Sequence, residues 1–540
     1  MSNYGFYTKA TANTPQTEPI PLREAEMVKG ASGAVAFKAD VWAVLRRCLI
    51  MGTADGSFYA GKQELTKDFA VILNEAIALD VQRVADEIVY ASNGKAINNS
   101  SSLFALALFS TAESYLANKL FKEIFPKVVR TGSHFHEWLS YTKGIRGLGR
   151  SIRTVAKDWI QKGDTDLEAY QMLKYGQRHG FSFRDALRLF KPIPQTDCQK
   201  NLYAWVVGKP YDLEQVPKII KGYEWLKANP DRGVEAVKTY GLTHEMVAPV
   251  AKMNQDVWQA LFETMPVTAL LRNLASLTEI GVINVKAIAN LNRVESIFTN
   301  QETLRKARVH PMDILKALKI YQSGGRLGLS QKTWIPVARI VDILKKALEL
   351  SFYTQERTNK VFFHAIDVSG SMGWTNATFN LKKENDPNNK ILTCCEIATV
   401  MALVSIKSEP NYFIGGFSTK FKQLGLTASD SFSSATKKIP EMNYGGTDAA
   451  SAYDYAIKNK IYFDVICFWT DFESWAGKRH PSQALADYRK KVNPKAKAIY
   501  TTLAPNELDL ADPKDRNSWS FNGFDPTIPS LIQSIAGDEV

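Results

Sequence analysis

The chain has 540 residues, 45% of them hydrophobic and 11% aromatic, and it contains 67 Lys and Arg against 55 Asp and Glu. At roughly 150 residues per domain this length predicts about three domains, and the apolar content excludes both a disordered chain and a small disulfide-stabilised module. The five cysteines are odd in number and form no CxxC pair, so we expect buried thiols and neither a zinc nor a redox centre.

Residues 1–28 are predicted to be a polar N-terminal extension. They lack the basic and then apolar pattern of a signal peptide. The longest apolar run, around residues 103–109, is far shorter than the roughly 18 residues that a membrane-spanning helix needs. We therefore expect a cytoplasmic protein.

Residues 29–359 are predicted to form an all-helical domain. Apolar side chains recur there at three- and four-residue spacing, as in Leu270, Leu271, Leu274 and Leu277. Gly, Pro, Asn and Asp interrupt this pattern at short intervals, which is typical of paired helices. Such pairs can stack as an α-solenoid of the HEAT type, although a helical bundle would explain the same periodicity.

The positive charge of the chain belongs to this helical part. Residues 1–360 contain 48 Lys and Arg against 35 Asp and Glu, whereas residues 361–540 contain 19 against 20. Clustered cations bind phosphates and release counterions. The asymmetry therefore predicts a polyanionic partner for the helical domain.

Two basic segments are candidate phosphate-binding surfaces. Arg150, Arg153 and Lys157 stand at i, i+3 and i+7, so they should project from one helix face. Lys174 and Arg178 stand at i and i+4 and are predicted to share one face of a second helix. Further candidate contacts nearby are Gln177, His179, Arg184, Arg188 and Lys191. The alternative is that all of these side chains merely form the solvated faces of helices.

After residue 360, short β-branched and aromatic runs alternate with amphipathic helices. The predicted strands are residues 361–366, 412–417, 463–469 and 496–503, and the predicted helices include residues 391–407 and 448–457. This βαβ alternation is typical of a doubly wound parallel sheet. In such sheets ligands bind beyond the carboxyl ends of the strands.

Side chains suited to a hard cation follow two of these strands. Asp367, Ser369 and Ser371 follow the first strand as DxSxS, Thr447 lies in a Gly-Gly-Thr-Asp loop, and Asp471 follows the third strand. If the three loops meet, their carboxylates and hydroxyls form an all-oxygen shell for Mg²⁺. Because few of these ligands are charged, the cation would remain electrophilic and could accept an acidic group from a partner.

The DxSxS segment has two other interpretations. It could be an ordinary strand-to-helix turn whose serines cap the helix. It could also carry the strand-end aspartate of a haloacid dehalogenase phosphotransferase, but such enzymes need a second carboxylate where this chain has Ser369. The strand context and the later Thr447 and Asp471 favour the metal site. Since no Ser/His/Asp set, carboxylate pair or HExxH motif stands out, we expect a protein that is not an enzyme.

These residues match the metal-ion-dependent adhesion site of von Willebrand factor A domains. From about residue 29 onward the chain resembles the Ro autoantigen family, in which a TROVE module precedes such a domain and whose bacterial members are the Ro-related Rsr proteins. Matching helical segments are residues 45–59, 149–159, 174–178, 184–189, 265–274 and 307–311. Matching C-terminal segments are DVSGSM, GGTD, WTDFESWAG and residues 487–491.

The resemblance implies a fold and a function. The TROVE module, residues 29–359, should form a ring of HEAT-like repeats that the A domain, residues 360–540, closes. Small Y-type noncoding RNAs should bind the basic outer face, with Lys174 and Arg178 on the Y RNA-binding helix, and single-stranded ends of misfolded RNAs should enter the central hole. Family members serve RNA quality control and stress survival. In bacteria a Y RNA joins the ring to the exoribonuclease polynucleotide phosphorylase.

Two features depart from the family pattern. The family has a His after its Leu-Arg-Leu that helps to hold Y RNA, whereas here Phe190, Lys191 and Pro192 follow directly. An Asn-rich stretch at residues 376–390 is predicted to be a surface loop near the metal site. A second function is compatible with the same motifs: a metal-dependent protein-binding module whose A domain holds an acidic partner, with RNA binding incidental.

Overall fold

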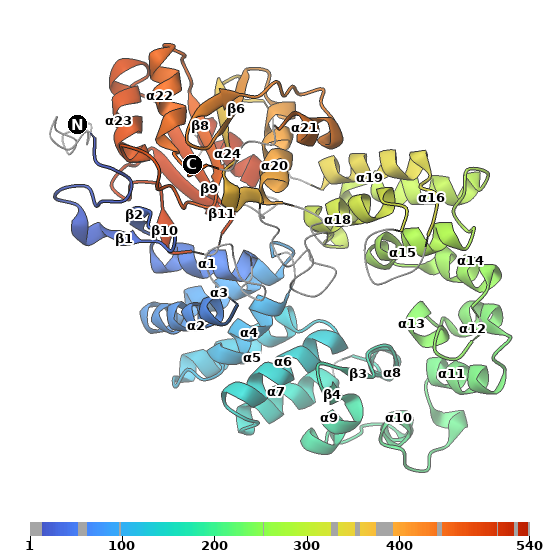
Figure 1. Cartoon of the computed structure of the whole chain (residues 1–540). Coiled ribbons are helices and arrows are strands. Elements are labelled where there is room, and N and C mark those ends of the chain that lie inside the picture. The colour runs from blue at the N-terminus through green and yellow to red at the C-terminus, as the bar shows by residue number, and fades with distance from the viewer. Residues whose placement is uncertain are drawn as a thin grey trace.

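The computed structural model describes residues 13–51, 62–96, 99–161, 163–251, 253–325, 333–351, 357–373, 393–439, 445–504, 506–522 and 528–537. Helices follow a ring-shaped path, and the C-terminal α/β domain lies between the first and the last of them (Figure 1). The predicted fold class is therefore confirmed. Residues 52–59 of one matching segment and the Asn-rich stretch 376–390 lie outside the described residues.

The helical domain is built from short helices. In chain order its first half contains α1 (Val41–Met51), α2 (Lys62–Leu79), α3 (Val81–Ser92), α4 (Ser100–Phe109), α5 (Tyr115–Val128), α6 (Gly132–Ile145), α7 (Arg150–Ile160), α8 (Thr165–Lys174), α9 (Phe183–Phe190) and α10 (Asp197–Val207). Its second half contains α11 (Lys218–Ala228), α12 (Gly233–Tyr240), α13 (His244–Val247), α14 (Gln255–Thr264), α15 (Val267–Glu279), α16 (Ile288–Phe298), α17 (Gln301–Lys306), α18 (Pro311–Gln322) and α19 (Ala338–Leu350).

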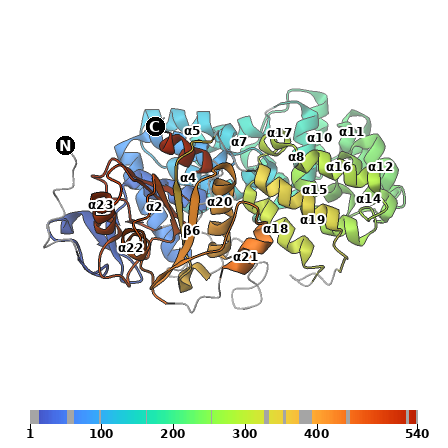
Figure 2. The same cartoon turned by 90° about the horizontal axis from the view of Figure 1, so that it is seen from above.

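Local sequence explains why these helices are short. Many begin at a polar residue whose side chain accepts a backbone N–H, such as Asp80 before α3 and Thr131 before α6. Others end at a glycine in the left-handed region, such as Gly208 after α10 and Gly241 after α12. Helices pack mainly against near neighbours in sequence, so they form a solenoid path and the bundle alternative is wrong (Figure 2).

The C-terminal domain has a six-stranded sheet of order β11-β9-β8-β5-β6-β7. Its strands are β5 (Phe362–Asp367), β6 (Tyr412–Phe417), β7 (Phe421–Gln423), β8 (Val465–Thr470), β9 (Lys497–Thr502) and β11 (Ser518–Asn522). All neighbours are parallel except β6 and β7. The four predicted strands correspond to β6 and, within two residues at each end, to β5, β8 and β9. The edge strands β7 and β11 were not predicted.

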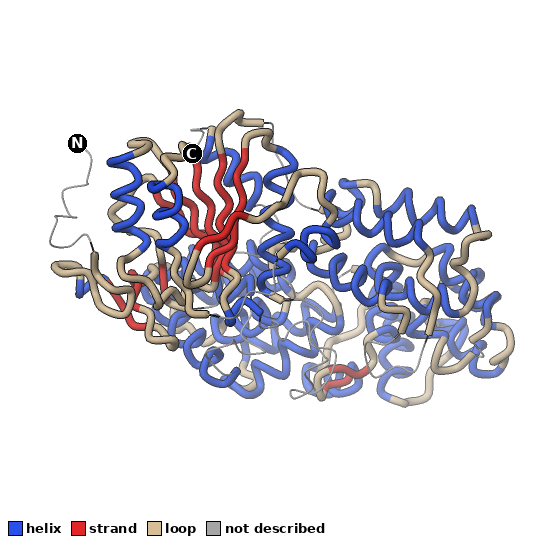
Figure 3. Tube along the Cα trace, turned by 45° about the horizontal axis from the view of Figure 1, so that its top comes forward, coloured by secondary structure: helices blue, strands red, loops and turns tan. Residues whose placement is uncertain are grey.

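Helices cover both faces of this sheet (Figure 3). They are α20 (Cys394–Ser408), α21 (Phe432–Lys438), α22 (Ala450–Lys458), α23 (Pro481–Lys491) and α24 (Ile528–Ala536). α22 and α23 pack on one face, where Phe363 and Phe468 point. α20 and α24 pack on the other face, whose apolar core is continuous with that of the helical domain. Both faces are therefore buried, as a doubly wound sheet requires.

The N-terminal segment is bound to the A domain. The strands β1 (Met27–Lys29) and β2 (Val35–Lys38) pair antiparallel, and β2 also pairs with β10 (Leu508–Asp509). The buried guanidinium of Arg23 donates to both carboxylate oxygens of Asp512, at 2.9 and 2.7 Å. Residues 13–28, which belong to the predicted polar extension, therefore pack against the A domain.

The A domain contacts both ends of the helical path. At the first end, the buried Arg47 of α1 donates to the backbone oxygen of Leu508 at 2.6 Å and pairs with Asp509 at 3.1 Å. At the last end, Lys319 of α18 pairs with Glu396 of α20 at 2.5 Å. These contacts close the ring. Among the described residues, no helix is both long and apolar enough to cross a membrane.

Candidate metal centre and candidate RNA-binding surface

The predicted metal ligands gather at the carboxyl edge of the sheet. Asp367 is the last residue of β5, and Asp471 directly follows β8, the parallel neighbour of β5. Parallel strands end at the same edge, so their following loops meet. Ser369 and Ser371 lie in the loop after Asp367, and Asp367, Ser369 and Ser371 are buried.

Hydrogen bonds orient this group of oxygen atoms. The Ser369 backbone N–H donates to Asp367 Oδ1 at 2.9 Å, and the Thr470 hydroxyl donates to Asp367 Oδ2 at 2.6 Å. Ser369 Oγ lies 3.2 Å from Ser371 Oγ, and the Ser371 side chain is hydrogen-bonded to Asp471. The structure thus brings four of the five predicted ligands into one connected group.

Thr447, in the segment before α22, contacts the loop that follows Asp471. Its backbone oxygen accepts the N–H groups of Trp475 and Ala476, both at 2.9 Å. Its hydroxyl oxygen is buried and has no hydrogen-bond partner. An unsatisfied buried polar group costs about 1–3 kcal/mol, so this oxygen would gain from a ligand.

The electrostatics of the group also fit a cation. Burial, and then repulsion by Asp471, raise the pKa of Asp367, and burial raises the pKa of Asp471. A divalent cation between these carboxylates would remove the repulsion. Within the described ranges no group of three or more His, Cys, Asp or Glu side chains is placed to hold a metal ion, so a shell here depends on hydroxyls. The donor set suits a hard cation such as Mg²⁺.

One buried residue at this edge was missed by sequence reasoning. Gln16 donates from Nε2 to Asp448 Oδ1 at 2.9 Å and accepts the hydroxyl of Ser474 at 2.5 Å. Its backbone N–H also donates to the Gly477 oxygen at 3.0 Å. Gln16 therefore joins the loop of Thr447 to the loop that follows Asp471. No local signal could have found it, because more than 400 residues separate it from both partners.

The first basic segment lies on one helix, α7, as its spacing predicts. Arg150 and Arg153 are exposed and Lys157 is half-buried. Arg153 also has a structural contact, since its guanidinium donates to the backbone oxygens of Leu148 at 3.1 Å and Leu189 at 2.9 Å. It thereby joins α7 to the end of α9.

The prediction that Lys174 and Arg178 share a helix face is wrong. α8 ends at Lys174, and Arg178 belongs to a two-stranded hairpin of β3 (Gln177–Arg178) and β4 (Phe181–Ser182). The hairpin turn consists of His179 and Gly180, both with positive φ, which suits the tight turn of such a hairpin. The glycines at positions 176 and 180 are the sequence signal that could have indicated the break.

The side chain of Lys174 is also less accessible to a ligand than those of its neighbours. Only 13% of its side chain is exposed, its ammonium donates to the Tyr170 hydroxyl at 3.0 Å, and it lies 3.8 Å from Glu245. By contrast, Gln177, Arg178 and His179 are exposed on the hairpin. His179 Nε2 lies 3.9 Å from Glu137.

α9 continues the basic surface beside the hairpin. Arg184 and Arg188 are exposed on this helix, and the exposed Lys191 ends it in the left-handed conformation, with φ 49°. The helix begins at a capping box between Ser182 and Asp185. The predicted RNA-binding residues therefore come from α7, the end of α8, the hairpin and α9, which are neighbours in Figure 1.

A shared aromatic core holds these elements together. Phe135 of α6 stacks on Trp159 of α7 with ring centroids 4.5 Å apart, and it also stacks on Phe183 of α9 at 6.2 Å. Trp159 Nε1 donates to the buried backbone oxygen of Val129 at 2.6 Å. Exposed cations on these elements are thus carried by a rigid base.

Comparison with known proteins gives consistent results. Residues 361–536 match the family model of the Ro60 vWA domain, and residues 240–364 match that of the TROVE domain. The RNA-binding protein RO60 of Deinococcus radiodurans is 31% identical over 537 residues, which cover 98% of each chain. The protein of that name from Caenorhabditis elegans is 26% identical, over 95% of this chain and 90% of the relative. The crystal structure of the D. radiodurans RO (RSR) protein superposes with a TM-score of 0.67 at 30% identity, covering 93% of this chain and 100% of the other.

Proposed function

The chain belongs to the Ro60 family, and on that premise we propose that it is an RNA-binding ring protein that binds small Y-type RNAs on the outer face of its helical domain. Single-stranded ends of misfolded noncoding RNAs enter the centre of the ring. The protein acts by binding rather than catalysis, in RNA quality control and stress survival. A bound Y-type RNA links it to an exoribonuclease such as polynucleotide phosphorylase.

The observation that carries this proposal is the row of exposed cations over the aromatic core of α6, α7 and α9. Arg178, Arg184 and Arg188 are exposed and lie on adjacent elements, so their guanidinium groups can each bind a phosphate oxygen pair. The hairpin also offers the amide of Gln177 and the imidazole of His179. Since the core beneath is tightly packed, little backbone order has to be gained when RNA binds.

Lys174 has a different role in this proposal. Its ammonium is held by Tyr170 and lies near Glu245, so it contributes positive potential behind the hairpin rather than a free phosphate contact. Lys191 takes the position that follows α9, where the family pattern has its His two residues after Leu-Arg-Leu. A lysine there provides a phosphate contact but no imidazole, so we expect RNA affinity to depend less on pH than with a histidine.

A gel-shift titration tests the proposal. Arg178→Ala with Arg184→Ala and Arg188→Ala should weaken binding of a small structured RNA by about 2–3 kcal/mol, the sum expected for three exposed charge-assisted contacts. The matched control is Lys119→Ala with Lys238→Ala and Lys306→Ala, which removes three exposed lysines of the same domain on α5, α12 and α17. Equal effects of both variants would mean that binding is nonspecific charge attraction, against the proposal.

We further propose that Asp367, Ser369, Ser371, Thr447 and Asp471 bind Mg²⁺. The orphaned hydroxyl of Thr447 and the mutual repulsion of the two carboxylates support this. When bound, the cation would supply a Lewis-acidic position for an acidic group of a protein partner. The Asp367 carboxylate is already held in place for such a cation, because the Ser369 backbone N–H and the Thr470 hydroxyl donate to its two oxygens.

The same metal site supports the second candidate function, a metal-dependent protein-binding module. Copurification from cells distinguishes the RNA-binding function from the protein-binding function. Under the first function, sequencing of the bound RNA shows that one small structured RNA dominates. Under the second, a protein partner is retained in Mg²⁺ and released by chelator, while the RNA that copurifies has no dominant species.

A further inference from the structure

One exposed histidine lies in the candidate RNA-binding surface. The chain contains seven histidines, and all of them belong to the described residues. Only His179 is exposed, with 40% of its side chain accessible to solvent, whereas the others are buried or half-buried. It occupies the turn of the β3–β4 hairpin, and a Cβ added to its neighbour Gly180 would meet no described atom within 4 Å. The turn therefore faces open space, where a ligand can approach.

A carboxylate lies behind this imidazole. His179 Nε2 is 3.9 Å from Glu137 Oε2 of α6, and only 14% of the Glu137 side chain is exposed. The other oxygen, Oε1, accepts the hydroxyl of Tyr141 at 3.2 Å. Burial, and then the charge of Glu137, raise the pKa of Tyr141, so this hydroxyl stays a donor. Glu137 is thus held in place next to the hairpin turn.

A second histidine beneath the turn does not gain charge in the same pH range. His136 is fully buried, and neither of its ring nitrogens has a hydrogen-bond partner among the described residues. Its ring packs against that of Phe183, with centroids 4.6 Å apart. Burial, and then the charges of His179 and Arg178, lower the pKa of His136 to about 4. His136 therefore stays neutral near neutral pH, which leaves His179 as the histidine of this surface that can change its charge there.

Further charged groups lie on the elements packed around the turn. On α9, Asp185 accepts the backbone N–H of Ser182 at 2.9 Å, and hydrogen bonding from the Ser182 side chain is the first cause that lowers the pKa of Asp185. On β3, Arg178 adjoins the imidazole. On α6, the ammonium of Lys143 lies 5.6 Å from the ring centroid of Phe181. Aspartate, arginine and lysine ordinarily keep one charge state between pH 5 and 8.

We propose that His179 makes RNA binding proton-linked: a phosphate of the RNA contacts the imidazole from its exposed side, Glu137 lies behind it, and the imidazole takes up a proton from solution when the RNA binds. Two negative groups beside one imidazole favour its charged form. Histidine is also the side chain whose charge ordinarily changes between pH 5 and 8. A protonated ring donates from both nitrogens, so one can face Glu137 and the other a phosphate oxygen.

The inference rests on the proposed function and deepens it, because it concerns the regulation of the same surface. The charged imidazole attracts a phosphate and the neutral one does not, so RNA affinity should rise as the pH falls. One added charge-assisted contact should change the affinity by about tenfold. Lys191, which stands near the family's His position, cannot supply this pH dependence.

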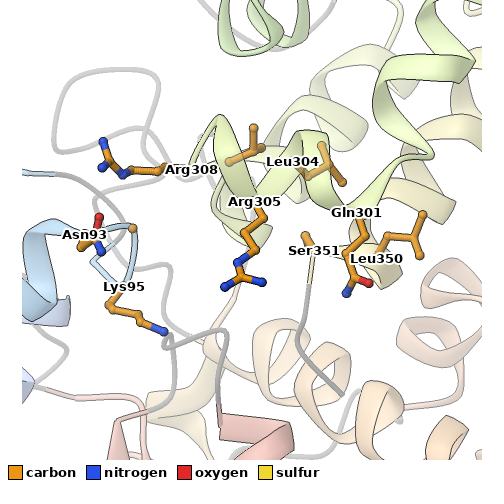
Figure 4. A pocket seen from close by; sticks show the side chains of 10 residues that line it. Asn93, Lys95, Gln301, Leu304, Arg305, Arg308, Leu350 and Ser351 are labelled. Carbon is orange, nitrogen blue, oxygen red and sulfur yellow. The ribbon is translucent and has the colours of Figure 1, made fainter. Parts of the chain in front are cut away.

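Cations elsewhere on the helical domain are not accompanied by a histidine. A small pocket between the turn after α3 and the end of α17 is lined by Lys95, Arg305 and Arg308, and its described lining contains no histidine (Figure 4). Because lysine and arginine ordinarily stay charged between pH 5 and 8, an RNA contact at such a place would weaken with salt but not with pH. The pH profile therefore reports on the hairpin rather than on cations in general.

The test is a fluorescence anisotropy titration of the full-length protein with one stem-loop RNA, at constant ionic strength, with EDTA present and from about pH 5.5 to about pH 8. Wild-type affinity should be about tenfold higher at the acidic end. His179→Asn should not gain affinity in acid, and asparagine tolerates the φ of 51° that this turn position requires. His179→Arg, which carries a permanent charge, should bind tightly across the whole range.

Two further variants separate His179 from its surroundings. Glu137→Gln can keep the hydrogen bond to Tyr141 but removes the charge, so the rise in affinity should move to lower pH. Glu168→Gln removes a carboxylate of α8 whose pKa burial raises to about 7, and it should keep the wild-type profile. Calorimetry in buffers of different ionisation enthalpy measures the proton directly. Near neutral pH the wild type should take up a fraction of a proton on binding RNA, and His179→Asn should take up none.

A flat pH profile in the wild type overturns the inference, and so does an undiminished profile in His179→Asn. If His179→Asn does not fold, a profile in His179→Arg as steep as that of the wild type has the same meaning. Failure of the proposed function looks different. If the variant lacking Arg178, Arg184 and Arg188 binds RNA weakly while the wild type takes up no proton, the surface is correct and only the role of His179 is wrong. If that triple variant binds as tightly as the wild type, the surface itself is wrong.

Discussion

The two candidate sites differ in how their side chains are held. At the sheet edge of the A domain, Asp367 and Thr447 are fully buried, and hydrogen bonds hold both oxygens of Asp367. On the helical domain, Arg178 and Arg188 are exposed on short elements. A cation surrounded by ligands requires fixed distances, whereas a flexible polyanion requires only accessible charge on a rigid base. A single substitution should therefore abolish binding at the candidate metal site, whereas each substitution on the candidate RNA-binding surface should weaken binding by a smaller amount.

The strongest loss of binding is expected at the candidate metal site. Asp367→Ala should abolish Mg²⁺ binding, because Asp471 would remain as the sole carboxylate among the proposed ligands. Isothermal titration with Mg²⁺ measures this, and Asp454→Ala, which removes an exposed aspartate of the same domain, is the control. Wild-type affinity in Asp367→Ala would show that the proposed ligands do not form one site.

A second substitution of Asp367 tests whether its carboxylate serves Mg²⁺ binding or only the stability of the fold. Without metal, Asp367→Asn should raise the melting temperature, since it removes a buried charge and its repulsion by Asp471, which in that order raise the pKa of Asp367. With saturating Mg²⁺ it should lower the melting temperature relative to wild type. RNA affinity should be unchanged in both conditions. A lower melting temperature without metal would indicate that the carboxylate is needed for folding itself.

The second prediction compares Lys174 and Arg178, which are close in sequence but differ in burial. Lys174→Ala should lower the melting temperature, because it removes the hydrogen bond to Tyr170 and the ammonium group that lies 3.8 Å from Glu245. Arg178→Ala should leave the melting temperature unchanged and weaken RNA binding by about 1 kcal/mol. Thermal unfolding and gel shifts on both variants decide this. Equal stability of the two variants would contradict the different burial of the two side chains.

A third prediction concerns a buried carboxylate of α8, the helix that precedes the hairpin. Glu168 of α8 accepts the Gln199 amide at 2.8 Å and the Tyr203 hydroxyl at 3.1 Å, yet burial raises its pKa from 4.5 to about 7. The folded state therefore binds this proton more tightly than the unfolded state. The resulting stability is fully present below pH 4.5 and is lost as the pH rises through about 7.

Glu168→Gln should remove this pH dependence. At about pH 8 the variant should be more stable than wild type by about 1–2 kcal/mol, and near pH 4.5 the difference should vanish. Denaturant unfolding at a series of pH values measures this. A constant difference between variant and wild type across the series would mean that Glu168 does not titrate in that range.

The smallest expected effect tests the contact of the N-terminal segment with the metal site. Gln16→Leu should remove the hydrogen bonds to Asp448 and Ser474 and so loosen the loop of Thr447. We expect Mg²⁺ affinity to fall by roughly threefold to tenfold, about 1 kcal/mol, without loss of the site. Titration with Mg²⁺ measures it, and Gln82→Leu, an exposed glutamine of α3, is the control. Unchanged affinity would restrict Gln16 to a structural role.

Features that depend on short-range pattern could be predicted from the sequence. Side chains at helical spacing, such as Leu270 and Leu274, are buried in α15 as expected. The strand β6 has the predicted bounds. Asp367 and Asp471 could be placed together because both follow strands, and adjacent parallel strands end at one edge. Local order and strand direction suffice for such inferences.

Tertiary structure alone decided what depends on distant contacts or on where a helix ends. The helical spacing of Lys174 and Arg178 implied one face, but the glycines that follow α8 end the helix and place Arg178 on a hairpin. Gln16 reaches the metal edge only because residues 13–38 pack on the A domain. Gly94 lies against Arg308, although the two residues are far apart in the sequence. The physical reason is the same in each case: sequence patterns report local periodicity, whereas contacts between distant segments depend on how the helices and the sheet pack together.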